Sequence, residues 1–131
     1  MKWLGRFWRI FGPVAGLLSM TGCGDMCGNT ILSETTAQGS HKRAVVFERD
    51  CGATTDFSTQ LSILEANEHA PVGGGNVFVA DSDHGAVTNL SVSVQWVSPY
   101  HLVVSFPARA RVFLQEAHLG GVSISYEKIG L

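Results

Sequence analysis

Hydrophobic and polar residues alternate over several short stretches of this chain, which is the pattern of β-strands with one buried face. The clearest alternation predicts a strand over 90–96, with its four apolar side chains on one face. Residues 102–106 follow a Ser-Pro-Tyr turn and are predicted to return as the hairpin partner. Residues 122–126 alternate in the same way.

Other stretches give a weaker or different pattern. Residues 43–49 are apolar at both parities, as expected of a strand covered on both faces. Residues 59–64 predict a strand with Leu61 and Ile63 inward, and shorter strands are expected at 30–34 and 76–80. Residues 108–118 are ambiguous, because the residue types favour helix while the apolar cluster 112–114 suits a strand.

Together these elements predict an all-β fold. About six to eight short strands with one polar face form a single-domain antiparallel β-sandwich or an open barrel, arranged as a meander, with room for one short helix at the ambiguous segment. The polar segments 65–75 and 81–89 are predicted to be loops.

The start of the chain has a different pattern. Three basic residues precede an uncharged run over 10–20, and small residues then lead to Cys23, which is the layout of a secretory signal peptide. The run is about half of the roughly 20 residues needed to cross a bilayer. Extending it backwards would bury Arg6 and Arg9, which is costly. The expected plan is therefore a signal peptide over 1–22, a tether over 23–29 and a β-rich domain over 30–131.

Thr21-Gly22-Cys23 resembles the lipobox of bacterial lipoproteins, in which the Cys receives a diacylglycerol and, with it, palmitate-type chains. Met20 stands where that family usually has Leu. Gly24 follows the Cys, in the slot where some bacteria use Asp for inner-membrane retention. The resemblance implies a membrane-anchored protein of the bacterial cell envelope, in the outer membrane and facing the periplasm. The alternative is a soluble secreted or periplasmic domain that is cut nearby.

The number of cysteines agrees with an exported, lipid-anchored protein. Three Cys in an exported chain leave one odd thiol, and lipidation of Cys23 leaves Cys27 and Cys51 to pair in an oxidising compartment. A disulfide closing a loop of about 25 residues contributes about 3.5 kcal/mol in the chain-entropy model. The alternatives are two reduced thiols or a metal-bound pair, although a metal would want more ligands at closer spacing.

Four strings resemble a family of small uncharacterised bacterial lipoproteins and exported proteins: residues 25–29, 44–55, 58–60 and 75–81. The Arg-Asp-Cys-Gly-Ala-Thr-Thr string at 49–55 is the most specific of them. The resemblance covers most of the mature chain and agrees with pairing Cys27 to Cys51. It implies no activity.

Composition narrows the classes of function. Without residues 1–22, six Lys and Arg stand against all 11 acidic residues, a formal net charge of −5. An exported domain of this charge is a poor partner for nucleic acid. The low charged content, 15% of the chain, and the frequent β-branched residues argue against disorder.

Two polar clusters are candidates for binding. Asp81, Asp83 and His84 lie in a loop whose spacing resembles the start of a calcium loop, but Gly85 and Val92 replace later ligands, so a solvated loop is the favoured interpretation. Arg49 and Asp50 precede Cys51. They are interpreted first as a salt bridge and turn that fix the disulfide corner, and second as a recognition patch.

The sequence predicts no catalytic site, cofactor or metal centre. The five histidines are scattered without ligand spacing. Ser125 and Lys128 match a Ser-x-x-Lys pattern, but in a strand they point to opposite faces. The expected function is a non-enzymatic binding or envelope-structural module, attached to the membrane through Cys23 and open to an envelope protein partner. The alternative is a small envelope enzyme or cation-binding protein that uses Asp81, Asp83 and His84.

Overall fold

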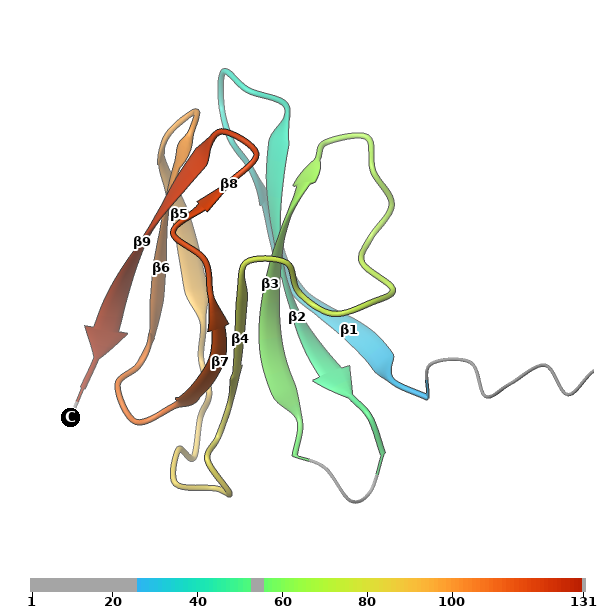
Figure 1. Cartoon of the computed structure of the whole chain (residues 1–131), viewed down its shortest axis with the longest axis vertical. Helices are drawn as coiled ribbons and strands as arrows, with labels where there is room; N and C mark the ends of the chain where they lie inside the picture. The colour runs from blue at the N-terminus through green and yellow to red at the C-terminus, as the bar shows by residue number, and fades with distance from the viewer. Residues whose placement is uncertain (1–25, 53–55, 131) are drawn as a thin grey trace, which may run out of the picture.

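The computed structural model of this chain describes residues 26–52 and 56–130 (Figure 1). The predicted signal peptide and Cys23 lie outside the described residues. Within the described part all regular structure is β, and no helix is present. The strands are β1 Gly28–Thr36, β2 Lys42–Asp50, β3 Ser58–Glu65, β4 Phe78–Asp81, β5 Ser93–Ser98, β6 His101–Pro107, β7 Arg111–Gln115, β8 His118–Leu119 and β9 Val122–Ile129.

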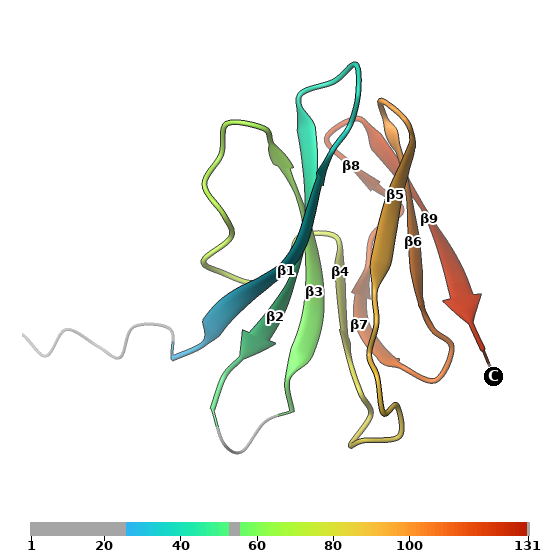
Figure 2. The same ribbon diagram turned by 180° about the vertical axis from the view of Figure 1, so that it is seen from behind.

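The strands form two stacked sheets. The first has the order β1-β2-β3-β4-β7 and the second the order β5-β6-β9-β8. Figures 1 and 2 show the two sheets face to face, with the chain crossing between them after β4, β6 and β7. The predicted all-β sandwich is confirmed. The nine strands of the described residues exceed the expected six to eight.

Two strand pairs depart from the expected antiparallel meander, because β4 pairs with β7 and β6 pairs with β9 although neither pair is consecutive in the chain. β6 and β9 are parallel, with His101 opposite Ser123 and Pro107 opposite Ile129. The chain leaves the second sheet after β6, passes through β7 of the first sheet and returns through β8. It therefore enters β9 from the same end as β6. Parallel neighbours need such a long connection, whereas a hairpin could only have made them antiparallel.

The core lies between the sheets. Phe78 and Phe106 are buried, with ring centroids 4.9 Å apart, and Tyr126 packs 5.8 Å from Phe78. Burial raises the pKa of Tyr126 to about 12, and its hydroxyl donates to the Glu116 carbonyl at 2.6 Å. The aromatic cluster thus fastens β9 to the corner between β7 and β8.

Two local predictions are resolved by neighbouring strands. The ambiguous segment forms the strands β7 and β8. In β7, Leu114 pairs with Val79 of β4 and Arg111 pairs with Asp81. The short β8 pairs with β9. The strand predicted over 90–96 begins only at Ser93, whose register partner is Ser105. Beyond that pair β6 reaches Pro107, which has no N–H to extend the ladder.

Strand β2 is buried on both faces, as its pattern predicts. Ala44 and Val46 face the core, while Val45 and Phe47 point to the outer face of the first sheet and are also fully buried. Residues 66–76 cover that face: they lie on the side of the first sheet away from the second (Figures 1 and 2). Gly75 allows this close approach, because a Cβ there would lie 2.8 Å from the Leu61 carbonyl oxygen.

Phe78→Ala is expected to lower the free energy of unfolding by about 3–5 kcal/mol, since it opens a cavity beneath two other rings. Phe57→Ala is the matched control, because Phe57 is 56% exposed, and a change within about 0.5 kcal/mol is expected there. Urea unfolding of both variants with the disulfide intact measures the difference. Equal losses would contradict the placement of Phe78 at the centre of the core.

Candidate functional site

A polar row crosses the outer face of the first sheet and contains residues from both candidate clusters. Its members are successive register partners on five strands: Asn29, Arg49, Ser58, Asp81 and Arg111. Ala80, the neighbour of Asp81, points into the core, so the row points outward. Strands lie about 4.8 Å apart, so the two ends of the row are about 19 Å from each other.

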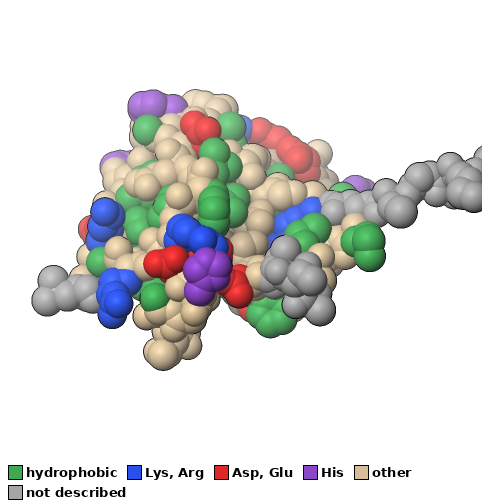
Figure 3. Space-filling model, turned by 60° about the horizontal axis from the view of Figure 1, so that its bottom comes forward, with side chains coloured by type: hydrophobic (Ala, Val, Ile, Leu, Met, Phe, Trp, Pro, Cys, Tyr) green, Lys and Arg blue, Asp and Glu red, His purple; other side chains and the backbone are tan. Residues whose placement is uncertain are grey.

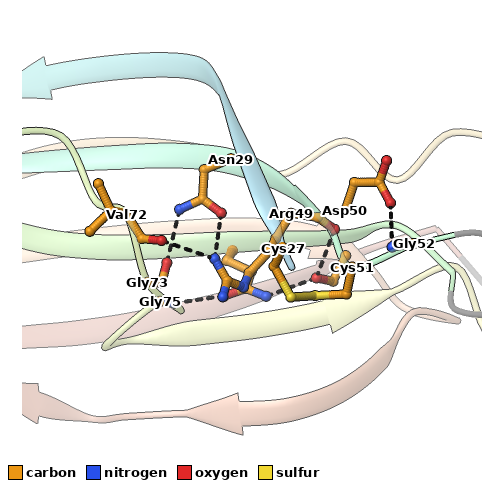
Figure 4. Close-up of a disulfide and its surroundings, with 11 residues drawn as sticks. Cys27, Asn29, Arg49, Asp50, Cys51, Gly52, Val72, Gly73 and Gly75 are labelled. Carbon is orange, nitrogen blue, oxygen red and sulfur yellow. Dashed lines mark hydrogen bonds between the residues drawn. A yellow bond between two sulfur atoms is a disulfide. The ribbon is translucent and has the colours of Figure 1, made fainter. Parts of the chain in front are cut away.

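The Arg49 end of the row is structural. Arg49 is only 8% exposed and donates to Asn29 Oδ1 at 2.7 Å and to the Val72 carbonyl at 3.3 Å. The Asn29 amide donates to the carbonyls of Pro71 and Gly73 (Figure 4). This network holds the covering segment 66–76 against β1 and β2. Arg49 is thereby engaged within the fold rather than presented to a ligand.

The Cys27–Cys51 disulfide lies directly beside this network (Figure 4). It links the residue before β1 to the residue after β2, as predicted. Asp50 is not part of the row; its carboxylate accepts from the Gly52 N–H at 2.9 Å and shapes the turn. The turn hydrogen bond expected at this corner is present at Asp50, whereas, among the described residues, Arg49 bonds to the neutral groups of Asn29 and Val72 in place of the expected salt bridge with Asp50.

The other end of the row carries an ion pair. Asp81 is 5% exposed, and both of its carboxylate oxygens accept from Arg111, at 3.0 Å from Nε and 2.5 Å from the second nitrogen. The Arg111 bonds hold the pKa of Asp81 below its ordinary value against the opposing effect of burial, and the Asp83 N–H adds to the lowering. The Asp81 carboxylate in turn raises the pKa of Arg111.

His84 joins this pair from the loop that follows β4. Asp83, His84 and Gly85 all have positive φ, 51°, 56° and 85°, which is uncommon for residues with a side chain. His84 Nε2 lies 3.1 Å from an Arg111 nitrogen. Because a guanidinium only donates, Nε2 is the acceptor in this contact, and Nδ1 lies 3.5 Å from Asp56.

A β-bulge adds an aromatic side chain. The register of β4 and β7 shifts between Val79 and Ala80, whose partners are Leu114 and Val112, so Phe113 is the extra residue. Phe113 is 61% exposed and its ring lies 5.0 Å from the Arg111 guanidinium. We call Asp56, Asp81, His84, Arg111 and Phe113 the Arg111 corner; they line a hollow of about 410 Å³ together with Ser58 and Val79.

Figure 3 shows basic, acidic and histidine side chains gathered side by side at this end of the molecule. The structure brings together Asp81, Asp83 and His84, as the sequence suggests; Asp83 lies 4.0 Å from Arg111. The sequence pattern does not identify Arg111 and Phe113 as site residues, because their segment fits both a helix and a strand. Their only signal was a basic and an aromatic residue two positions apart.

Other candidate chemistry lies elsewhere. Within residues 26–52 and 56–130 no group of three or more His, Cys, Asp or Glu side chains is arranged to hold a metal ion. Ser125 lies on β9, where its hydroxyl is 2.7 Å from His101 Nε2 on β6. The two side chains meet on the outer face of the second sheet, since the neighbours Leu102 and Ile124 point into the core.

Comparisons of the chain with protein-family models, with curated proteins and with solved structures found no match. Among the described residues, none forms a helix that is long and apolar enough to span a bilayer. Any role of the Arg111 corner must therefore be inferred from its own geometry.

Arg111→Gln is expected to lower the free energy of unfolding at neutral pH, because the buried Asp81 carboxylate loses its cation. The pKa of Asp81 is depressed below 3.8 in the folded state, so this stabilisation is present above pH 3.8 and is lost as the pH falls through the depressed value. The difference in the free energy of unfolding between wild type and variant should therefore disappear at acidic pH.

Arg109→Gln is the matched control, since Arg109 is exposed in the turn before β7. Denaturant unfolding of the three proteins over a pH series measures both effects. The Asp81–Arg111 ion pair would be contradicted if Arg111→Gln lost no more stability than Arg109→Gln. A loss that persists well below pH 3.8 would also contradict it.

Proposed function

We propose that this protein is an exported, lipid-anchored, non-enzymatic binding module of the bacterial cell envelope, facing the periplasm, and that the Arg111 corner is its binding surface. The signal peptide and lipobox-like residues support the location, and the geometry of the Arg111 corner supports binding.

The disulfide supports the proposed location outside the cytoplasm. Cys27 and Cys51 are bonded to each other, so Cys23 is the one remaining cysteine of the chain. A disulfide of this kind is typical of proteins outside the reducing cytoplasm. The lipobox resemblance assigns the lipid to this remaining cysteine. Two or three acyl chains on that sulfur would hold the domain firmly, whereas one chain binds only marginally.

The single observation that carries the binding role is the exposed Phe113 beside a fixed arginine. Aromatic and arginine side chains dominate the energetics of protein interfaces. Asp81 and His84 together occupy three of the five N–H donors of Arg111, so the side chain is held in place by residues of the described part of the chain. A preordered side chain loses little conformational entropy when a partner binds.

The cation-binding alternative is weaker on this geometry. The guanidinium of Arg111 already occupies the position next to both Asp81 oxygens that a metal ion would take. Asp83 and His84 are directed to the same arginine, at 4.0 and 3.1 Å. A cation entering this cluster would have to displace Arg111.

An enzymatic role would draw on the Ser125–His101 contact, because a hydroxyl beside an imidazole is the start of a nucleophilic site. Acyl transfer also needs N–H donors aimed at the developing oxyanion. On β6 and β9 the backbone N–H groups lie in the plane of the sheet, where they form the ladder, and not above the face that carries Ser125. This arrangement favours binding over catalysis.

Cys23→Ala is expected to release the domain from membranes without unfolding it. The exported variant should keep the Cys27–Cys51 disulfide, because that bond forms independently of residue 23. Fractionation of envelopes measures attachment, and thiol labelling of the denatured protein measures the disulfide. Membrane attachment that survives the substitution would refute the lipid anchor.

Phe113→Ala is expected to weaken capture of the binding partner by roughly 30-fold, the equivalent of about 2 kcal/mol for an interface hot spot. Tyr100→Ala is the control, because Tyr100 is exposed to a similar extent, 53% against 61%, but lies in the β5–β6 turn. Quantitative crosslinking and pull-down of both variants from intact envelopes tests this. Equal recovery of the partner by both variants would remove the Arg111 corner as the binding surface.

A further inference from the structure

Two apolar side chains stand out at the point where the chain enters the domain. Val72 is 88% exposed and Met26 is 82% exposed, while the next most exposed large apolar side chain of the described residues is Phe113 at 61%. An isolated exposed apolar residue needs no explanation. These two are linked through Asn29: Met26 lies three positions before it in the chain, and the Asn29 amide donates to the carbonyls on either side of Val72.

The fold ties both residues to the start of β1. Met26 directly precedes Cys27, which is bonded to Cys51. Val72 is at the tip of the covering segment, whose carbonyls at 71 to 73 accept from Asn29 and Arg49. Figure 4 shows Val72, Asn29 and Cys27 in one neighbourhood, and Figures 1 and 2 place the covering segment and the start of β1 on the same side of the molecule. We call Met26 and Val72 the exit surface.

We infer that the exit surface rests on the lipid bilayer that holds the anchor, so that the first sheet faces the membrane and the second faces away from it. This inference rests on the proposed lipid on Cys23. Met26 is three positions after Cys23, and a chain spans at most about 3.6 Å per residue, so the Cα atoms of Met26 and Cys23 lie within about 11 Å of each other. No other apolar surface of the described residues is held so near to the anchor by chain length.

The chemistry of the surface fits an interface rather than the hydrocarbon interior. Unbranched Met adapts to irregular apolar surroundings. The backbone carbonyls around Val72 are satisfied by Asn29 and Arg49, so the tip can leave bulk water without unpaired acceptors there. Because the anchor keeps the tip at a high effective concentration near the bilayer, even a weak apolar contact orients the domain.

The orientation has a consequence for the Arg111 corner. The corner lies on the same outer face, about 19 Å across the sheet from Asn29. A partner that binds there would be met close to the membrane surface. The serine-rich outer face of the second sheet, with Ser93, Ser105 and Ser125, would point into the periplasm.

The test uses the lipidated protein in vesicles whose phosphatidylcholine carries brominated acyl chains, which quench nearby tryptophan. Val72→Trp places a reporter at the exit surface. Val97→Trp is the matched control, because Val97 is 54% exposed on β5 of the second sheet. Trp96 is the single tryptophan of the predicted mature chain and gives the same background in both variants.

The Val72→Trp protein should show blue-shifted emission and should lose intensity in brominated relative to unbrominated vesicles. The Val97→Trp protein should change no more than the parent. If both float with the vesicles and quench equally, the exit surface is overturned while the lipid anchor stands. If neither floats, the anchor itself fails, and with it the inference.

Hydrogen exchange of the unsubstituted chain gives a second measurement that needs no new side chain. Segment 69–75 should exchange more slowly in the vesicle-bound protein than in soluble Cys23→Ala, while the β5–β6 turn is unchanged. Equal exchange of segment 69–75 in the two forms would count against the exit surface.

Discussion

The Cys27–Cys51 disulfide is the constraint on which the outer layer of this domain depends. β1 is a nine-residue edge strand that pairs only with β2 along its length, and edge strands fray from their ends. The disulfide closes that end. It thereby fixes Asn29, whose amide holds the covering segment in place over Val45 and Phe47. One covalent bond thus connects the start of the domain, where we propose that the lipid anchor is attached, to the packing of the second apolar layer.

The outer face of the first sheet is divided between two roles. Its β1–β3 part is closed by the segment 66–76 and carries the Asn29–Arg49 network. Its β4–β7 part is open and carries the Arg111 corner, where a bulge turns Phe113 outward. The same polar row runs through both parts. In the first part its side chains bond to each other and to the backbone carbonyls of the covering segment, and in the second they bond to each other around a hollow.

Several features could be predicted from the sequence because they depend on local pattern. The doubly buried β2, the inward Leu61 and Ile63, the β5–β6 hairpin and the two loops follow from alternation and turn residues. The disulfide followed from cysteine parity. These signals lie within a few residues of one another, or in a count of one residue type.

The features that could not be predicted depend on contacts distant in sequence. Asp81 and Arg111 are 30 residues apart, and only the β4–β7 register makes them partners. The parallel pairing of β9 with β6 depends on the crossing of β7 to the other sheet, which no alternation encodes. The doubly buried pattern of β2 indicated a cover, but nothing in the polar segment 65–75 identified it as that cover.

We propose that Cys23 carries a lipid while Cys27 and Cys51 are bonded to each other. Peptide mass spectrometry of the native exported protein tests this most directly. The account predicts a peptide pair joined through Cys27 and Cys51, together with an N-terminal peptide that begins at an acylated Cys23. A residue 23 that is unmodified and still joined to the residues before it, or one that is disulfide-bonded to either partner, would contradict it.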